Sequence, residues 1–141
     1  MLFGSHISAA GGPQNAPERA TEVGCEVFQF FSRPPQGGPG IKLTPTIVKE
    51  FKDNCKKYRQ AESYIHTPYY INFASIVPRI RFSSIAVVRE ELERGSLLGV
   101  KYIMTHLGST KQAGKELGFH KTWRAIQRIF HRSLWMRVAG G

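Results

Sequence analysis

The stretch "YIHTPYYIN", residues 64–72, decides the fold of this chain. Its first two residues favour a β-strand, and Pro68 ends that strand because proline has no N–H group to donate within a sheet. His66 therefore stands at the end of a strand, and Tyr69 follows it in a loop. The stretch thus presents a histidine and then aromatic side chains where a strand gives way to a loop.

Two further apolar runs lead to a histidine in the same way. The run that begins at Leu2 leads to His6, and residues 100–105 lead to His106. A fourth run, residues 27–31, is equally apolar but has no histidine. We expect a strand at each run, because short apolar segments bounded by turn residues are typical of buried strands.

Amphipathic stretches separate the runs, and we expect a helix in each. Asn15 is the expected N-cap of the first helix, and Thr44 that of the second. In the third helix, Glu90 and Arg94 have the spacing and order of a stabilising ion pair. The expected helices cover "NAPERATEVGC" (15–25), a segment that opens at Thr44-Pro45, "SSIAVVREELERGSLLG" (83–99) and roughly residues 121–131.

Strands and helices that alternate in this way predict an α/β fold with parallel strands. Two architectures satisfy the pattern: a doubly wound open sheet, or part of a (β/α)₈ barrel. A complete barrel needs about 250 residues, and this chain has 141. It supplies four βα units, with "SLWMRV" (133–138) as a candidate fifth strand.

The chain is strongly basic, with a formal net charge of +10 from 20 basic and 10 acidic side chains. No acid occurs from Leu117 to the end, so half of the excess lies in the last part of the chain. This balance favours a polyanionic partner such as nucleic acid, and a merely solubilising surface is the alternative.

Cysteine usage and hydropathy indicate a soluble, cytoplasmic protein. Cys25 and Cys55 are too few for a disulfide scaffold and lack the spacing of a zinc knuckle, so we expect buried, reduced thiols. No stretch approaches 18 consecutive apolar residues. The segment "MLFGSHISAA" (1–10) lacks the charged and apolar parts of a signal peptide.

The three strand-end histidines, His6, His66 and His106, are expected to gather at one edge of the sheet, where the carboxyl ends of parallel strands meet. Neutral imidazole is a common ligand of zinc and similar ions. A metal or phosphodiester site is one interpretation, and three structural, hydrogen-bonding histidines are the other. Two loops add candidates: "SAAGGPQN" (8–15) as an anion cradle or a tight turn, and "SRPPQGGPG" (32–40) as a partner contact or a surface loop.

The ten carboxylates lie away from these histidines in the sequence pattern. Eight fall in expected helices or loops, and Glu26 and Glu62 lie at strand beginnings. A hydrolase with several metal ions needs anionic ligands that bridge and balance them. Histidines alone give at most a weak, open single-ion site, so we expect that this chain cannot complete a two- or three-metal centre by itself.

Three motifs resemble the N-terminal half of the endonuclease IV family, the zinc-dependent apurinic/apyrimidinic endonucleases among the xylose-isomerase-like barrels. They are "GSHISAAGGPQNAPERATEVGCEVFQFFSR" (4–33), "YIHTPYYINFAS" (64–75) and "YIMTHLGS" (102–109), in order and with the expected spacing. The resemblance implies a partial (β/α)₈ TIM barrel. It also implies an enzyme with three zinc ions that cuts double-stranded DNA 5′ to an abasic site.

The resemblance implies roles for single residues. His66 and His106 match the family's zinc-ligand histidines at the ends of strands three and four, which hold the same ion. Tyr69 matches a tyrosine that contacts DNA at the lesion. The loop after strand two inserts into DNA in the family, often through an arginine; here Gln36 is nearest to that position, with Arg33 close by.

The end of the chain departs from the family pattern. Arg137, in "SLWMRVAGG", stands where the family has a bridging glutamate, and the ligands from strands six to eight have no counterpart. We therefore expect residues 1–118 to form the N-terminal half of a barrel and residues 119–141 to form a divergent basic tail, through truncation, a frame change or adaptation. His6 lies in the opening motif and receives no ligand role.

These features allow three functions. The first is a DNA-repair endonuclease by descent, whose half present here is inactive or weakly active and holds at most one zinc ion. The second is a non-catalytic DNA-binding fragment, and the third is a fragment of a sugar isomerase or epimerase. A half barrel also leaves two open sheet edges and an apolar inner face, so we expect a homodimer that completes the barrel, or aggregation.

Overall fold

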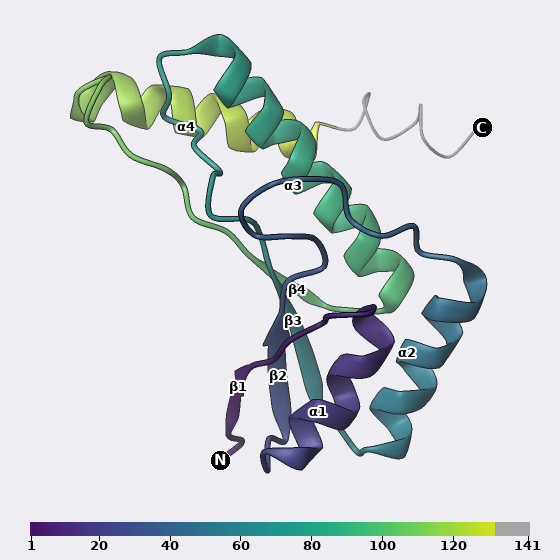
Figure 1. The fold of residues 1–141 in the computed structure, drawn as a ribbon. Helices are drawn as coiled ribbons and strands as arrows, with labels where there is room; N and C mark the ends of the chain where they lie inside the picture. The colour runs from purple at the N-terminus through teal and green to yellow at the C-terminus, as the bar shows by residue number, and fades with distance from the viewer. Residues whose placement is uncertain (132–141) are drawn as a thin grey trace. The chain divides into compact units, whose positions relative to one another are not determined.

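The computed structural model describes residues 1–131, which form two compact units (Figure 1). Unit 1 comprises residues 1–70 and 90–105, and the described part of unit 2 comprises residues 71–89 and 106–131. The long helix α3 contributes its first half to unit 2 and its second half to unit 1. The candidate fifth strand at 133–138 lies outside the described residues.

Unit 1 is built on a sheet of four parallel strands in the order β1-β2-β3-β4. A doubly wound sheet would reverse its strand order at a switch point, whereas successive neighbours are what a barrel requires. The predicted α/β class and parallel strands are confirmed, and the order favours the partial barrel. The strands are β1 (Gly4–His6), β2 (Val27–Phe30), β3 (Glu62–His66) and β4 (Tyr102–Met104).

Among residues 1–131, four α-helices follow the strands, as predicted, although two begin earlier than the sequence pattern suggested. Helix α3 begins at Pro78, five residues before the expected start, because proline is well suited to the first turn of a helix. Helix α4 begins at Lys115, directly after Gly114. The helices are α1 (Ala16–Glu22), preceded by the 3₁₀ turn η1 (Pro13–Asn15), α2 (Pro45–Lys57), α3 (Pro78–Leu98) and α4 (Lys115–Phe130).

The two predicted N-caps differ in outcome. Thr44 caps α2 as expected, since its hydroxyl accepts a hydrogen bond from the N–H of Ile47 at 3.3 Å. Asn15 precedes α1 but makes no side-chain cap; its amide instead donates to the carbonyl of Ala10 at 3.3 Å. The 3₁₀ turn before α1 places Asn15 in a helical conformation, whereas a capping side chain usually needs extended backbone.

The core of unit 1 lies between the sheet and its helices. Phe28 and Phe30 of β2 point to the same side, because side chains alternate along a strand. They meet Phe51 of α2, whose ring centroid lies 5.6 Å from that of Phe30. Ile65 of β3 and Leu98 of α3 complete this buried cluster. Helices therefore cover one face of the sheet and fix the positions of the strand ends.

The other face of the sheet, which was expected to be apolar, carries polar, aromatic and aliphatic side chains. His6, Gln29, Tyr64 and Tyr102 occupy neighbouring register positions across the four strands. The Nδ1 of His6 lies 3.2 Å from Oε1 of Gln29, and the rings of Tyr64 and Tyr102 stack with centroids 5.2 Å apart. Val27 of β2 and Met104 of β4 add aliphatic side chains to this face, which is therefore partly apolar and is exposed at Tyr102 and Met104.

The described part of unit 2 contains the first half of α3, helix α4 and two connecting segments, residues 71–77 and 106–114. Ile85 and Val88 of α3 are buried, as are Ala125 and Ile129 of α4. The segments are joined by a hydrogen bond from the N–H of Phe73 to the carbonyl of Leu107 at 3.1 Å. Among residues 1–131, no helix combines the length and the apolar character needed to span a bilayer.

Candidate functional site

His66 closes strand β3 with a defined protonation pattern. Its side chain is buried, and Nδ1 lies 2.6 Å from the carbonyl oxygen of Thr67. A carbonyl oxygen only accepts hydrogen bonds, so in neutral His66 the proton is on Nδ1 and the lone pair is on Nε2. This is the arrangement of a histidine that binds a metal through Nε2 while its other nitrogen donates to a backbone carbonyl.

Three aromatic rings surround the imidazole of His66. The ring centroids of Phe31, Tyr69 and His6 lie 4.9, 5.6 and 6.0 Å from that of His66. These residues come from the carboxyl ends of β1, β2 and β3 or from the loops that follow them. The structure therefore brings His6 and His66 together, as their equivalent strand-end positions predicted.

The segment after β3 passes from buried to exposed within three residues. Thr67 and Pro68 are buried, whereas Tyr69 is 60 % exposed. The backbone N–H of Tyr69 donates to the carbonyl of Pro35 at 3.2 Å. This hydrogen bond joins the loop after β3 to the loop after β2, so the two loops present their side chains together.

The loop after β2 places its two candidate residues differently. Gln36 is exposed in a turn in which the N–H of Gly37 donates to the carbonyl of Pro34 at 3.3 Å. Arg33 lies at the base of the loop, where its side chain is buried. Gln36 is thus accessible to a partner, while Arg33 is held within the protein.

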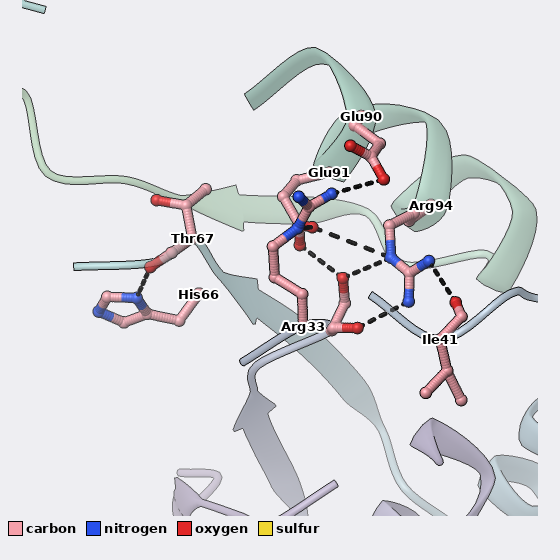
Figure 2. A network of polar contacts seen from close by, with 8 residues as sticks. Arg33, Ile41, His66, Thr67, Glu90, Glu91 and Arg94 are labelled. Carbon is pink, nitrogen blue, oxygen red and sulfur yellow. Dashed lines mark hydrogen bonds and ion pairs between the residues drawn. The ribbon is translucent and has the colours of Figure 1, made fainter. Parts of the chain in front are cut away.

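A buried polar network holds Arg33 (Figure 2). Its Nε lies 2.6 Å from Oε1 of Glu91, and its Nη2 lies 2.7 Å from Oε1 of Glu90. The hydroxyl of Ser32 donates to the other oxygen of Glu91 at 2.6 Å. Glu91 has no exposed surface, so its negative charge is balanced entirely by these neighbours and by Arg94.

Arg94, which lies on helix α3 together with Glu90 and Glu91, completes the network (Figure 2). Its Nε lies 3.9 Å from Oε1 of Glu91, and its guanidinium donates to the carbonyls of Ser32 at 2.6 Å and Ile41 at 2.8 Å. The predicted Glu90–Arg94 pair is corrected here, because Glu90 pairs with Arg33 while Arg94 turns toward the loop after β2. The network therefore fastens that loop to helix α3.

Burial and charge act in opposite directions on the two arginines. Burial disfavours the charge on Arg33, but hydrogen bonds to the carboxylates of Glu90 and Glu91 outweigh it and raise the pKa of Arg33. Burial lowers the pKa of Arg94, which has a weaker contact with Glu91. Both remain charged at neutral pH, since arginine loses its proton only above about pH 12.

Glu91 is the residue that sequence reasoning missed. We expected no carboxylate near a strand end, yet Glu91 reaches from α3 to Ser32 and Arg33, just beyond the end of β2. The sequence did offer a signal, since two adjacent glutamates, Glu90 and Glu91, lie on the same helix as Arg94. The expected ion pair used Glu90, whereas the buried carboxylate is the next residue, Glu91. Because Glu91 is already neutralised by two arginines, it serves the architecture of the site.

The loop between β1 and α1 borders a surface pocket of about 590 Å³, whose lining includes His6, Phe31 and Arg33. Within this loop the N–H groups of Ala10 and Gly12 are already bonded, to Ser8 Oγ and to the carbonyl of Ala9. These internal hydrogen bonds favour the interpretation of "SAAGGPQN" as a tight turn over that of an anion cradle.

His106 follows strand β4 by two residues and belongs to unit 2. Within residues 1–131, no three histidine, cysteine, aspartate or glutamate side chains form a group that could hold a metal ion. The pairing of His66 with His106 stays a prediction, as do the DNA contacts of Tyr69, Gln36 and Arg33. Arg137, at the position of the family's bridging glutamate, lies outside the described residues.

Comparisons with known proteins agree on one family. A family model described as xylose isomerase-like TIM barrel matches residues 17–134. "Probable endonuclease 4" of Methanoculleus marisnigri is 38% identical over 130 residues, covering 92% of this chain and 46% of that protein. The protein of the same name from Halothermothrix orenii is 32% identical, covering 92% of this chain and 47% of its own length. The chain thus spans about half the length of the curated relatives it matches.

Solved structures show the same relationship. The crystal structure of endonuclease IV from Thermus thermophilus superposes with a TM-score of 0.78 at 29% identity, covering 94% of this chain and 49% of that one. A D-psicose 3-epimerase has a TM-score of 0.66 at 12% identity, covering 92% of this chain and 47% of its own. The likeness to the epimerase shows a common fold and nothing about activity.

Proposed function

Because this chain belongs to the xylose isomerase-like TIM barrel family, we propose that it forms the N-terminal half of an endonuclease IV-like site, which hydrolyses the DNA phosphodiester 5′ to an abasic site. Its relatives named endonuclease 4 support this reaction class. The observation that carries the proposal is His66, buried at the end of β3 with its Nε2 lone pair defined, beside the exposed Tyr69. These are the residue types and the location that the reaction needs.

His66 fits the chemistry of a zinc ligand, and His106 would be the second ligand of the same ion. Zinc, where bound, activates water as a nucleophile and stabilises the charge on the leaving oxygen. The described residues alone do not supply a complete set of ligands for it. Our proposal is that the chain by itself holds at most one zinc ion and cuts DNA slowly or not at all.

Tyr69 and Gln36 are the proposed contacts to the lesion. The ring of Tyr69 packs edge-on against Phe31, with centroids 5.2 Å apart, and remains largely exposed. A positioned aromatic ring stacks on a nucleobase, which contributes about 1–3 kcal/mol in nucleic-acid complexes. Gln36, on the neighbouring loop, has the exposure that insertion beside a lesion demands. Arg33 would support Gln36 from the base of the loop.

The test combines zinc content with incision of a duplex that contains one abasic site. We expect the purified chain to bind no more than one zinc ion, the His66→Gln variant to lose it, and the matched His120→Gln variant to keep it. Incision should be absent or slow for all three proteins. Retention of zinc by His66→Gln would contradict the ligand assignment, and rapid multiple-turnover incision would contradict the incomplete site.

DNA binding without cleavage is the second candidate function, and the net charge of +10 favours it. The electrostatic part of such binding weakens steeply as salt rises. Fluorescence anisotropy with an abasic and an intact duplex, in a chelating buffer, separates it from the first candidate. Affinity that does not change with salt would exclude binding through phosphates.

The edges of the sheet support a proposal about assembly. Strands β1 and β4 each have a single neighbour in the described sheet, and open edges invite pairing with another chain. We propose that two copies associate, so that each covers an open edge of the other. Light scattering on the purified chain tests this, and a monomer with cooperative unfolding would contradict it.

A further inference from the structure

The excess positive charge is confined to one of the two units. Unit 1 contains ten basic and nine acidic side chains, so its charges nearly cancel. The described part of unit 2 contains eight basic side chains and a single acid, Glu116. The basic character of the chain is therefore a property of unit 2, and it needs an explanation there.

Four of these cations line one pocket between the first half of α3 and helix α4. The pocket has a volume of about 120 Å³, and no acidic residue lines it. None of its cations forms an ion pair with any residue from 1 to 131. The cations are Arg81, Lys121, Arg124 and Arg128, and we call them the basic cluster.

Contacts within unit 2 hold two members of the basic cluster in place. The guanidinium of Arg81 lies 5.2 Å from the ring centroid of Phe82 and donates to the carbonyl of Ser75 at 2.8 Å. The guanidinium of Arg128 lies 5.1 Å from the centroid of the same ring, and the guanidinium of Arg89 donates to the backbone carbonyl of Arg128. Groups that are ordered before binding lose less entropy when a ligand arrives.

The arrangement of the cluster on α4 opposes helix stability. Lys121, Arg124 and Arg128 are spaced three and four residues apart, so like charges are neighbours on the helix surface and repel. The helix dipole favours Arg128 in the last turn, but it gives no benefit to Lys121 and Arg124 near the middle. An unneutralised cluster that costs stability is best explained by an anionic partner.

We propose that the basic cluster binds phosphate groups of a nucleic acid backbone without regard to base sequence. Lysine and arginine contacts to phosphates supply most sequence-independent affinity. Unit 2 also exposes the apolar side chains of Phe119, Trp123 and Phe130, which an anionic membrane could take up, but Phe82, the aromatic residue that lines the pocket itself, already contacts two guanidiniums. This contact uses no strand-end residue, so it is independent of phosphodiester hydrolysis.

The test is anisotropy of a fluorescein-labelled intact duplex, with the full chain, a chelator and a series of salt concentrations. The variant Lys121→Gln/Arg124→Gln removes two cations of the basic cluster, and Lys42→Gln/Lys56→Gln removes two exposed cations of unit 1. We expect the first variant to weaken binding roughly tenfold at low salt and to reduce the salt slope by about 2. The second should change affinity less than the first in every buffer.

Several outcomes would overturn the proposal. If the two variants weaken binding equally, the effect depends only on the net charge of the chain. If the first variant binds as well as the unmodified chain, the basic cluster does not contact the nucleic acid. Competition by anionic phosphatidylglycerol vesicles that depends on Lys121 and Arg124 would assign the cluster to a membrane surface. Because the duplex has no abasic site and no metal is present, failure of the proposed incision leaves this result unaffected.

Discussion

The two units of this chain use arginine in opposite ways. In unit 1, Arg33 and Arg94 are buried against Glu91, and Glu90 adds a second carboxylate to Arg33. In unit 2, Arg81 and its neighbours in the basic cluster face a pocket without an acid. One set of arginines holds a loop in place, and the other presents charge to the outside.

The difference teaches that net charge alone is a poor guide to where a partner binds. Arg33 is a candidate DNA contact because it lies close to the position through which the loop of the resembled family inserts into DNA, yet the structure gives its charge two carboxylate partners. A charge that is neutralised within the fold contributes little to long-range attraction. Attraction of a polyanion is therefore expected to depend on unit 2.

The largest expected loss of stability comes from disrupting the buried network of Arg33, Arg94 and Glu91. Glu91→Gln keeps the size of the side chain but leaves Arg33 and Arg94 without their shared buried charge. Removing one partner of a buried ion pair costs about 3–5 kcal/mol, so we expect unfolding in urea at a much lower midpoint. Circular dichroism measures the shift.

Glu93→Gln is the matched control for that substitution. Glu93 lies on the same helix, and no hydrogen bond or ion pair of its side chain occurs among the described residues. Its replacement should change the free energy of unfolding by less than about 0.5 kcal/mol. Similar midpoints for the two variants would show that the network holds the loop without contributing to stability.

The second prediction tests how well the interior of unit 1 excludes water. Burial raises the pKa of the Cys55 thiol to about 12, well above the ordinary value of about 8.5. In a Cys25→Ser background at pH 8, we expect Ellman's reagent to react more than about a thousandfold slower with the native protein than with the urea-unfolded one, because only the thiolate attacks. Equal rates would place Cys55 in water.

The sign of the associated pH effect follows from the raised pKa. Above the unfolded pKa, the unfolded chain loses the Cys55 proton while the folded chain keeps it, so unfolding becomes more favourable as pH rises. Stability from this group is complete below about pH 8.5 and declines toward the folded pKa of about 12. A Cys55→Ala variant should lack this component of the alkaline decline.

The order of strands and helices was predictable because it depends on local patterns. The apolar run at 27–31, the cap at Thr44 and the proline after His66 each act within a few residues, and the structure confirms the element expected from each. The outcome for Asn15 differed because a 3₁₀ turn inserted before α1 changed its backbone conformation.

The candidate site was only partly predictable, because some of its contacts join distant segments. Equivalent strand ends were enough to bring His6 to His66. The contact between Arg33 and Glu91 spans 58 residues, and no spacing rule distinguishes Glu91 from Glu90 in advance. The rotation of α3 about its axis decides which glutamate is buried, and that rotation is set by packing.

The third prediction compares the helix starts of the two units. In α2 the hydroxyl of Thr44 satisfies the N–H of Ile47, whereas Gly114 before α4 makes no side-chain cap. We expect Thr44→Ala to lower the free energy of unfolding by about 1 kcal/mol, and Thr46→Ala, inside the first turn of the helix, to have a smaller effect. A loss of stability in Thr46→Ala as large as in Thr44→Ala would contradict the cap.

The smallest effect, and the one with the opposite sign, belongs to the basic cluster. Arg124 has a like charge three residues before it and another four residues after it, and such pairs destabilise a helix by about 0.2–0.5 kcal/mol each. We therefore expect Arg124→Gln to raise the free energy of unfolding slightly, as measured by urea titration at low salt. Added salt should erase the gain, because it screens exposed charges.

Arg59→Gln is the matched control for Arg124→Gln, since Arg59 is an exposed arginine of unit 1 and its left-handed backbone is similarly unfavourable for arginine and glutamine. It should show no stabilisation that depends on salt. If Arg124→Gln were destabilising at low salt, Arg124 would be an internal contact like Arg33, and the contrast between the two units would fail. A gain confined to Arg124→Gln means that the fold tolerates this charge at a cost, which is the behaviour expected of a residue kept for a partner.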